Sequence, residues 1–397
     1  MPGFVNLRKN NLKTLGIDVT GHKIAILGGG QLGKMLCQAG SRLGLDIIVM
    51  DKDTSFPCAT VCPSYFCGDI RNYDDVMAFG QKADIITIEI EDVNVKALEE
   101  LEKQGKKVFP QPSVLKVIKD KGLQKMFYEA AGLPATSFGL YKDRQEILDS
   151  VHNGSLSLPF VQKVRTGGYD GRGVQIVRDT DGLKLLMEGP SVVEEVADVS
   201  CEISVIAART ESGEVTVFPA AEMEFHSGAN LAEYIFAPSG INSETASEAA
   251  RIAVMAAQKL GIVGLLAVEM FVTGDGKVII NESAPRPHNS GHHTIEACVT
   301  SQYEMHLRAI LGLPLGNTEL IMPAVTVNLL GEDGYSGTVR YNGLEEILAV
   351  PGVYPHLYGK KETRPFRKMG HVTIVNKDLT KAILTAKMIK ETLKITT

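Results

Sequence analysis

The chain has 397 residues, 44% of them apolar, and its 41 Lys and Arg against 47 Asp and Glu give a formal net charge of −6. The acidic balance argues against a dedicated nucleic-acid binder, and the apolar fraction argues against a disordered chain. Six cysteines are too few for a disulfide scaffold, and no apolar run reaches the roughly 20 residues of a membrane span. We expect a cytoplasmic protein of several domains, with no secretory signal in residues 1–20.

Residues 23–110 predict a doubly wound α/β domain. Strands are expected over residues 23–27, 46–50, 84–90 and 108–109, with helices over 34–42 and 73–80. Strands and helices that alternate at this spacing are typical of a parallel, Rossmann-like sheet.

From residue 134 the pattern changes to strands joined by glycine-rich turns. Strands are expected over 159–165, 174–177 and 192–196, helices over 181–187 and 244–260, and a hairpin over 265–272 and 278–281. Before this change, a further helix is expected over 120–132. The last segment combines strands over 324–329 and 370–375 with a helix over 380–393. Three domains are the simplest division.

The first glycine loop, GGGQLG, admits two interpretations. Gly28, Gly30 and Gly33 fit G-x-G-x-x-G, and Asp51 ends the next strand, where a dinucleotide site places its ribose-binding acid. A P-loop is excluded because Met35 stands where a metal-binding Ser or Thr is required. The loop therefore either offers backbone N–H groups to an anion or allows a strand and a helix to pack closely.

The second glycine loop, QKVRTGGYDGRGV over residues 162–174, combines four glycines with Lys163, Arg165 and Arg172. An ordinary hairpin needs one or two glycines. A flexible loop with backbone donors and cations suits a bound polyphosphate.

Two carboxylates lie on the arms of the hairpin that turns at TGDGK. If Val272 pairs with Val278, Glu269 faces Asn281, and a shift of one residue places it opposite Glu282. Such oxygen ligands suit Mg²⁺ bound together with nucleotide phosphates. Glu194 and Glu195, at the end of another strand, are candidates for an adenine or ribose contact.

Two further loops are rich in anion-binding side chains. APRPHNSGHHT, over residues 284–294, suits phosphate or carboxylate better than zinc, since its histidines are too crowded to act as separate ligands. GKKETRPFRKMGH, over residues 359–371, is either a solvated charge run or an anion site for a phosphorylated substrate.

Four blocks resemble the signatures of the 5-(carboxyamino)imidazole ribonucleotide synthetase family within the ATP-grasp superfamily. They are GGGQLGKML, KVRTGGYDGRG, NESAPRPHNSGHHTIEA and RPFRKMGH. The resemblance implies a Rossmann-like domain over 1–120, with an extension over 1–20, and an ATP-grasp domain over 121–320 with a lid over 134–197. A small β-rich C-terminal domain is implied over 321–397. The implied reaction carboxylates the amine of 5-aminoimidazole ribonucleotide with ATP and bicarbonate, through carboxyphosphate, and releases ADP and phosphate.

The resemblance also implies roles for matching residues. ATP is expected to contact Lys121, Lys163, Gly168, Tyr169, Asp170, Gly171, Arg172, Gly173, Glu194, Glu195, Val196, Ala197, Glu202, Asn281 and Glu282. The ribonucleotide is expected at Gln31, Leu32, Tyr169, Asp170, Arg364, Arg367, Lys368 and either Lys360 or Lys361. Arg286, Asn289 and Ser290 are the implied catalytic residues, and Glu269 and Glu282 the implied Mg²⁺ ligands. The expected partners are these small molecules and a second copy in a homodimer, with no nucleic acid or membrane.

Two positions depart from the family pattern. Phe366 stands where the family usually has Gly, and the stretch around His226 lacks the family's Glu-Asn-x-His, so His226 is given no role. The alternatives are another ATP-grasp carboxylase or formyl ligase, a dinucleotide-dependent oxidoreductase based on the first glycine loop, and a non-catalytic homologue. The last would be expected to have lost Glu269 or Glu282.

Overall fold

The computed structural model describes residues 21–168, 173–225 and 231–397. The roles expected of Tyr169, Asp170, Gly171 and Arg172, the position of His226 and the extension over 1–20 lie outside the described residues. Within the described ranges, no helix combines the length and apolar character that crossing a membrane requires.

The N-terminal part forms a parallel sheet in the order β3-β2-β1-β4-β5. Its strands are β1 (Lys23–Leu27), β2 (Asp46–Asp51), β3 (Tyr65–Cys67), β4 (Ile85–Ile88) and β5 (Lys107–Val108). The Rossmann-like prediction is confirmed. The prediction missed β3, a three-residue edge strand with two exposed side chains, because it has no apolar run to mark it.

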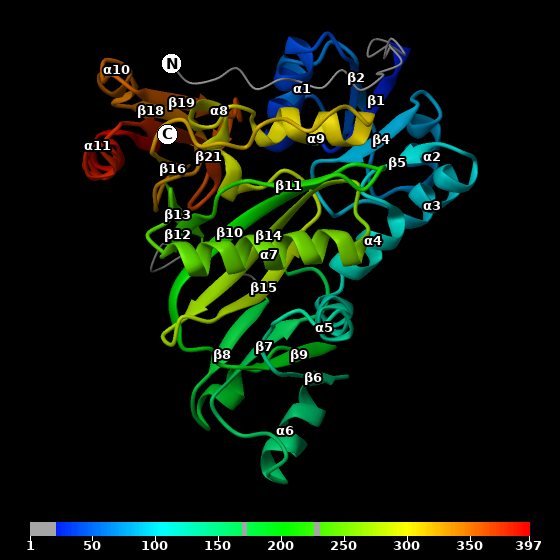
Figure 1. Cartoon of the computed structure of the whole chain (residues 1–397), viewed down its shortest axis with the longest axis vertical. Coiled ribbons are helices and arrows are strands. Elements are labelled where there is room, and N and C mark those ends of the chain that lie inside the picture. The colour runs from blue at the N-terminus through cyan, green and yellow to red at the C-terminus, as the bar shows by residue number, and fades with distance from the viewer. Residues whose placement is uncertain (1–20, 169–172, 226–230) are drawn as a thin grey trace, which may run out of the picture.

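Helices cover both faces of this N-terminal sheet. One face packs against α2 (Tyr73–Gly80) and α3 (Val95–Lys103), through Val76, Phe79 and Leu98. The other packs against α1 (Gln31–Arg42) and, from much later in the chain, α9 (Gln302–Leu311). Figure 1 shows α9 alongside α1 at the upper end of the molecule. The second half of the chain is thereby anchored to the N-terminal sheet.

The central sheet runs β15-β14-β10-β12-β13-β16-β21-β19, with β11 paired to β10. Its strands are β10 (Val199–Arg209), β11 (Val215–Val217), β12 (Ala221–Phe225), β13 (Ala232–Ala237), β14 (Gly264–Thr273), β15 (Val278–Ala284), β16 (Ala324–Leu330), β19 (Val353–Leu357) and β21 (Lys368–Val375). Because β13 pairs antiparallel with β16, the C-terminal strands extend the sheet of the middle segment. Strand periodicity alone does not reveal which sheet a strand joins.

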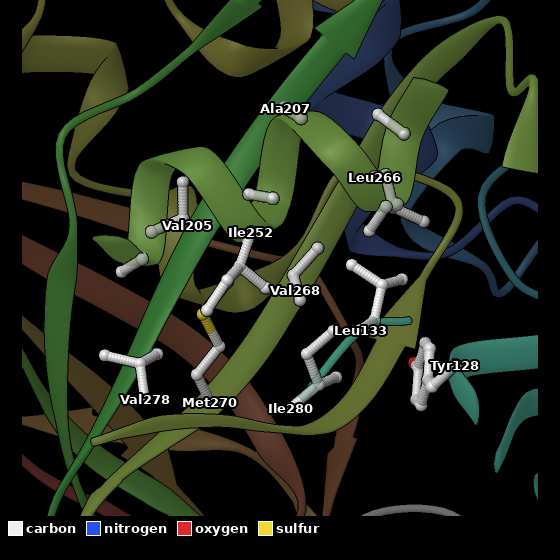
Figure 2. Packing of buried hydrophobic residues seen from close by; sticks show 14 of the residues in the cluster. Tyr128, Leu133, Val205, Ala207, Ile252, Leu266, Val268, Met270, Val278 and Ile280 are labelled. Carbon is white, nitrogen blue, oxygen red and sulfur yellow. The ribbon is translucent and has the colours of Figure 1, made fainter. Parts of the chain in front are cut away.

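The main core lies between α7 (Ser243–Leu260) and the central sheet. Its buried residues recur at helical spacing, Ala249, Ile252, Ala253, Ala256 and Ala257, and the small alanines let the helix approach the strands. Figure 2 shows Ile252 packed beside Val268 and Met270 of β14. The helix ends at Gly261, whose φ of 67° is the left-handed C-cap conformation that glycine favours.

A small antiparallel sheet, in the order β6-β9-β7-β8, forms the lower end of Figure 1. Its elements are β6 (Phe138–Tyr141), β7 (Phe160–Val164), β8 (Val174–Val177) and β9 (Ser191–Glu195), together with α5 (Lys121–Ala130) and α6 (Arg144–His152). The helix expected over 181–187 is wrong: only a 3₁₀ turn forms over Gly182–Leu185. Leu183 and Leu186 both reach the core of the small sheet, and a three-residue spacing suits that turn.

The remaining elements are short, apart from α11 (Leu379–Thr392), which packs on β16 and β21. They are α4 (Pro112–Ile118), α8 (Thr294–Ala297), α10 (Leu344–Leu348), β17 (Gly337–Thr338), β18 (Arg340–Asn342), β20 (Glu362–Thr363) and β22 (Lys394–Thr396).

Candidate active site

The carboxylate pair owes its geometry to an irregular hairpin. Val272 pairs with Val278 and Met270 with Ile280, but Glu269 pairs with Glu282. Asn281 is therefore the extra residue of a β-bulge. The pairing of Val272 with Val278 agrees with the first of the two predicted registers. Beyond the bulge the ladder is shifted by one residue, so that Glu269 faces Glu282 as in the second. Bulged out of the ladder, Asn281 accepts a hydrogen bond from Lys163 Nζ at 2.8 Å.

Glu269 and Glu282 experience different electrostatic surroundings. Burial and the neighbouring charge of Glu282 raise the pKa of Glu269. Burial also acts on Glu282, but the ammonium of Lys121, which donates to its Oε2, together with Lys163 and His288, lowers the pKa of Glu282. His288 Nε2 lies 3.2 Å from Glu269 Oε1. Glu269 is thus the carboxylate whose negative charge is least compensated.

This donor set fits a divalent cation shared with a nucleotide. Two carboxylates and an amide on one edge of a cleft are oxygen ligands of the kind that Mg²⁺ prefers. Over the described ranges, no group of three or more His, Cys, Asp and Glu side chains has the arrangement of a metal site. A cation held here would therefore complete its coordination with phosphate oxygens and water.

A cleft of about 340 Å³ lies between the small sheet and the central sheet. Its lining includes Lys121, Lys163, Gly168, Glu194, Glu195, Val196, Ala197, Glu202, Glu269, Asn281 and Glu282. The structure thus brings together most of the residues expected to contact ATP. Gly173 is not among the lining residues: its carbonyl accepts from Val164 at the base of the β7–β8 hairpin. Its φ of 77° and the nearby Val164 side chain leave no room for a Cβ.

Sequence reasoning missed the apolar walls of this cleft. Val161, Ile176, Val199, Phe225 and Phe271 line it from the two sheets. Flat apolar surfaces of this kind suit a purine base. Each residue belongs to a strand of ordinary pattern, so only the packing of one sheet against the other assigns it to the cleft.

The side chain of Glu194 is engaged inside the protein. It lies 3.0 Å from Lys125 Nζ and 3.1 Å from Lys163 Nζ, and accepts a hydrogen bond from Thr136 at 2.6 Å. Its carboxylate therefore holds Lys163, while the rim of the cleft is formed by Glu195, Val196 and Ala197. Lys125 was not foreseen, although it lies one helical turn after Lys121. Burial lowers the pKa of Lys125 to about 8, against the opposing effect of Glu194.

Arg165 also has an internal partner. Its guanidinium binds the carboxylate of Asp120 through two hydrogen bonds, of 2.8 and 2.6 Å. Asp120 caps α5 by accepting from the backbone N–H of Gly122 and Leu123. This bidentate pair fixes the start of α5, and hence Lys121, to the end of β7.

The first glycine loop does receive an anion, but the anion is a side chain of the protein. Glu89 accepts hydrogen bonds from the backbone N–H groups of Gly30, Leu32 and Gly33, at 3.0 to 3.1 Å. Asp51 accepts from Gly29 at 2.6 Å. Both carboxylates occupy donors that a dinucleotide phosphate would need, so the oxidoreductase interpretation loses its binding site. A Cβ at Gly30 would lie 2.4 Å from Glu89 Oε1, which explains the glycine.

The remaining predicted ribonucleotide contacts near this loop are Gln31 and Leu32, which begin α1. Gln31 is half-buried and Leu32 is buried.

The loop that follows β15 connects the central sheet to the N-terminal sheet. Arg286 Nε donates to Glu91 Oε2 at 2.9 Å, just beyond the end of β4. Ser290 is buried and donates to Ser204 of β10 at 2.8 Å, while its Oγ lies 2.9 Å from His288 Nδ1. Asn289, between His288 and Ser290 in the sequence, is half-buried. Glu91 was missed in the sequence because it lies just beyond the strand expected over 84–90, outside the motifs singled out.

The basic side chains of the loop before β21 differ in their burial and in their hydrogen-bond partners. Lys360 is half-buried and donates to the carbonyl of Lys368 at 2.6 Å, whereas Lys361 and Arg364 are exposed. Arg367 donates to the carbonyl of Glu362 at 2.7 Å. The ammonium of Lys368 lies close enough to Glu269 to oppose the rise in the pKa of that carboxyl. Of the two adjacent lysines, Lys360 therefore points inward.

Phe366 in this loop has a φ of 60°, in the left-handed region. Glycine adopts that conformation without strain, whereas for other residues it costs roughly 1–2 kcal/mol. The backbone thus gives a physical reason for the glycine that the family usually has at this place.

Comparisons with known proteins agree along the chain. Three family descriptions match in order: ribonucleotide synthetase preATP-grasp domain over 21–119, ATP-grasp domain over 126–303, and phosphoribosylaminoimidazole carboxylase C-terminal domain over 324–384. The N5-carboxyaminoimidazole ribonucleotide synthase of Bacillus subtilis is 36% identical over 89% of this chain and 92% of its own. The chain belongs to the N5-carboxyaminoimidazole ribonucleotide synthase family.

Solved structures of this synthase family share the fold. The N5-carboxyaminoimidazole ribonucleotide synthetase of Thermotoga maritima has a TM-score of 0.87 and 40% identity, over 95% of this chain and 99% of its own. The synthase of Aspergillus clavatus, in complex with ADP and 5-aminoimidazole ribonucleotide, has a TM-score of 0.84 and 28% identity, over 93% and 98%. The chain spans 64% of the length of the chloroplastic phosphoribosylaminoimidazole carboxylase of Vigna aconitifolia, at 35% identity.

Family membership confirms two predictions made from the sequence. The chain has the fold class expected of the synthases, with a preATP-grasp part, an ATP-grasp part and a C-terminal part. It is also an ATP-grasp ligase of the ADP-forming kind.

Proposed function

We propose that this chain carboxylates the exocyclic amine of 5-aminoimidazole ribonucleotide, at the expense of ATP and bicarbonate, in purine biosynthesis. One observation carries the assignment to this cleft: Glu269 and Glu282 face each other across the bulged hairpin, beside Lys121 and Lys163. Membership of the synthase family supports the substrate. Phosphoryl transfer needs positioned cations more than a nucleophilic side chain, and the cleft supplies cations.

ATP is proposed to bind with its base between the apolar walls and its phosphates near Lys121 and Lys163. Glu202, which lines the cleft, is proposed to contact the ribose, and Glu195 to Ala197 to contact the edge of the base. Glu269 and Glu282, with Asn281 beside them, are proposed to hold Mg²⁺. When bound, this cation neutralises charge on the phosphoryl group in transfer. Lys121 then leaves Glu282 and contacts phosphate.

The chemistry proposed is the family's two steps. A bicarbonate oxygen attacks the γ-phosphorus, the bond to ADP breaks, and carboxyphosphate forms. The ribonucleotide amine then attacks the carboxyl carbon, phosphate leaves, and the amine proton departs with it or with solvent. Arg286, Asn289 and Ser290 are proposed to hold the carboxyl group. Lys360, Arg364, Arg367 and Lys368 are proposed to bind the ribonucleotide phosphate, near Gln31 and Leu32. Because carboxyphosphate is a mixed anhydride, the site has to exclude water.

Further proposals follow the family expectation. We propose a cytoplasmic homodimer and domain boundaries at residues 120 and 320, with the lid over 134–197. Sedimentation equilibrium over a tenfold concentration range tests the dimer, and a monomer mass throughout would contradict it.

The proposed reaction is tested by ADP release from the purified chain with Mg-ATP and bicarbonate, with and without 5-aminoimidazole ribonucleotide. We expect release to depend on the ribonucleotide. Equal release without it would leave the ATP site in place and overturn the substrate. Omitting bicarbonate is the matched control, since the proposed first step consumes it.

A further inference from the structure

Three histidine rings stack where the loop after β15 meets the C-terminal strands. The rings of His292 and His371 lie 4.1 Å apart between centroids and are inclined by 12°, and those of His371 and His356 lie 4.5 Å apart at 11°. His292 ends the loop that contains Arg286 and Ser290. His356 and His371 lie on β19 and β21, the strands that flank the basic loop. The stack therefore spans two loops that are far apart in the sequence.

Two tyrosines connect this stack by hydrogen bonds. The hydroxyl of Tyr358 lies 3.1 Å from His371 Nδ1 and 3.4 Å from His292 Nε2. The hydroxyl of Tyr303 lies 2.8 Å from His292 Nδ1. All four residues are buried, and burial lowers the pKa of both histidines, so each imidazole is neutral and has one N–H. The Tyr358 hydroxyl has a single O–H, so at least one of the two imidazoles donates to its oxygen, and the other either accepts its proton or donates as well.

Tyr358 also holds the base of the basic loop. Its backbone N–H donates to the carbonyl of Met369 at 3.0 Å, which closes residues 359–368 into a loop. The ammonium of Lys360 lies 5.4 Å above its ring, a cation–π contact. Lys34 of α1 donates to the neighbouring carbonyl of Leu357 at 3.0 Å. A single side chain, Tyr358, thus links the proposed phosphate loop to the His292 end of the other loop.

A second contact between the two regions involves a carboxylate rather than stacked rings. His356 Nε2 is 2.7 Å from Glu296 Oε1 of α8. An ion pair or hydrogen bond tolerates small rotations, whereas stacked rings joined through one shared hydroxyl fix both spacing and angle. The stack therefore restricts the relative position of the two loops more closely than the contact between His356 and Glu296 does.

We propose that Tyr358, His371 and His292 are positioning residues that set the spacing between the basic loop, residues 359–368, and the loop over 286–290. This inference rests on the proposed function, in which one loop holds the ribonucleotide phosphate and the other the reacting carboxyl group. The amine and the carboxyl carbon must meet at contact distance, and a displacement of about 1 Å can cost on the order of 100-fold in rate. The three residues act through these loops and touch no reacting atom.

Two matched substitutions test the proposal. Tyr358→Phe and Tyr303→Phe each remove one buried hydroxyl from His292, but only the hydroxyl of Tyr358 also reaches His371. We expect similar losses of thermal stability. We expect Tyr358→Phe alone to raise the KM for the ribonucleotide and lower kcat, together by ~10-fold or more in kcat/KM. The KM for ATP should stay within about twofold of the original value in both variants.

A third variant shows whether Tyr358 acts through the stack. His371→Asn keeps a hydrogen-bonding group near Nδ1 but removes the stacked ring. We expect it to raise the KM for the ribonucleotide as Tyr358→Phe does, and the double variant to add little to either. Additive effects would contradict a shared role.

The outcomes separate this inference from the proposed function. If the unsubstituted chain releases ADP in a ribonucleotide-dependent way and Tyr358→Phe leaves the KM for the ribonucleotide unchanged, the inference fails alone. Equal kinetic losses in the Tyr303→Phe variant would also overturn it, because they would reflect general loosening. If the unsubstituted chain shows no dependence on the ribonucleotide, the proposed function fails and the inference with it.

Discussion

Glu269 and Glu282 lie opposite each other across the β14–β15 hairpin because Asn281 is bulged out of the ladder. In an unbroken ladder Glu269 would face Asn281, and Glu282 would point to the other face of the sheet. The bulge therefore places both carboxylates on one face and turns the Asn281 amide towards Lys163. One irregular residue thus arranges the two proposed metal ligands and the amide beside them.

Replacing Glu282 by Gln should abolish ATP turnover while the chain remains folded. The neutral amide binds a divalent cation more weakly and leaves Lys121 without its carboxylate partner. We expect kcat to fall at least ~100-fold, equivalent to about 2.7 kcal/mol. Mn²⁺ binding in the presence of ADP, measured by calorimetry, should weaken in parallel. Glu224→Gln, at an exposed carboxylate on β12, is the matched control. Unaltered turnover in the Glu282 variant would remove the metal assignment.

The stability of the nucleotide-free protein should decrease as the pH rises towards 7. Burial raises the pKa of Glu202 to about 7, above its ordinary 4.5. The neutral acid is therefore favoured in the folded state. The associated stability is fully present below pH ~4.5 and is lost as the pH rises through about 7. Its upper limit is ~1.4 kcal/mol for each tenfold difference in proton affinity between the folded and unfolded states.

Urea denaturation between pH 4.5 and 8 measures this decline. Glu202→Gln cannot ionise, so its unfolding free energy should vary less over that range than that of the original chain. Glu345→Gln, at an exposed carboxylate on α10, should leave the decline intact. Identical pH profiles for the original chain and the Glu202 variant would contradict the prediction.

Glu89→Gln should destabilise the N-terminal sheet without creating a dinucleotide site. The amide keeps one acceptor oxygen, but its NH₂ group faces backbone N–H groups that Glu89 now satisfies. An unsatisfied buried donor costs ~1–3 kcal/mol, and we expect a loss in this range by urea denaturation. NADH fluorescence should show no binding in either form. A variant as stable as the original chain would show that water replaces the lost acceptor.

At position 366, a glycine variant should be more stable than an alanine variant, the reverse of the usual order. Both Phe366→Ala and Phe366→Gly remove the ring, but only glycine relieves the positive φ. We expect the glycine variant to be about 1 kcal/mol more stable than the alanine variant. At Tyr354, an exposed residue of β19, alanine should be the more stable by ~0.5–1 kcal/mol, as is ordinary in a strand. Thermal unfolding of the four variants measures these stability differences. If alanine were the more stable residue at both positions, strain at Phe366 would be ruled out.

The sequence was most informative where local chemistry determines the structure. The TGDGK turn predicted the hairpin, and one of the two registers considered for it pairs Val272 with Val278, as observed. The helix over 244–260 ends at Gly261, a C-cap glycine. The bulge at Asn281 was beyond prediction, since alternation along a strand does not show where a residue is inserted. Most of the residues that the resemblance assigns to ATP line one cleft, but their individual roles stay predictions.

Contacts between distant segments were the part that the sequence did not reveal. GGGQLG indicates free backbone N–H groups, but nothing near it in the sequence shows that Glu89, just after β4, accepts hydrogen bonds from them. In the same way, the sequence predicts Glu194 as an acceptor for a ligand, whereas in the structure its carboxylate lies beside Lys125 and Lys163. Such pairings depend on how elements pack, and the same local pattern is compatible with several packings.

The pairing of β13 with β16 has a consequence for dividing the chain. Tyr234 to Ala237 share a hydrogen-bonded ladder with Ala324 to Val327, so the family boundary between the middle and C-terminal parts runs through a continuous sheet. A fragment cut there would expose the backbone edge of β16, and a bare strand edge recruits strands from other molecules. Split reporters, domain swaps with relatives and isolated expression of the C-terminal part should therefore yield aggregates.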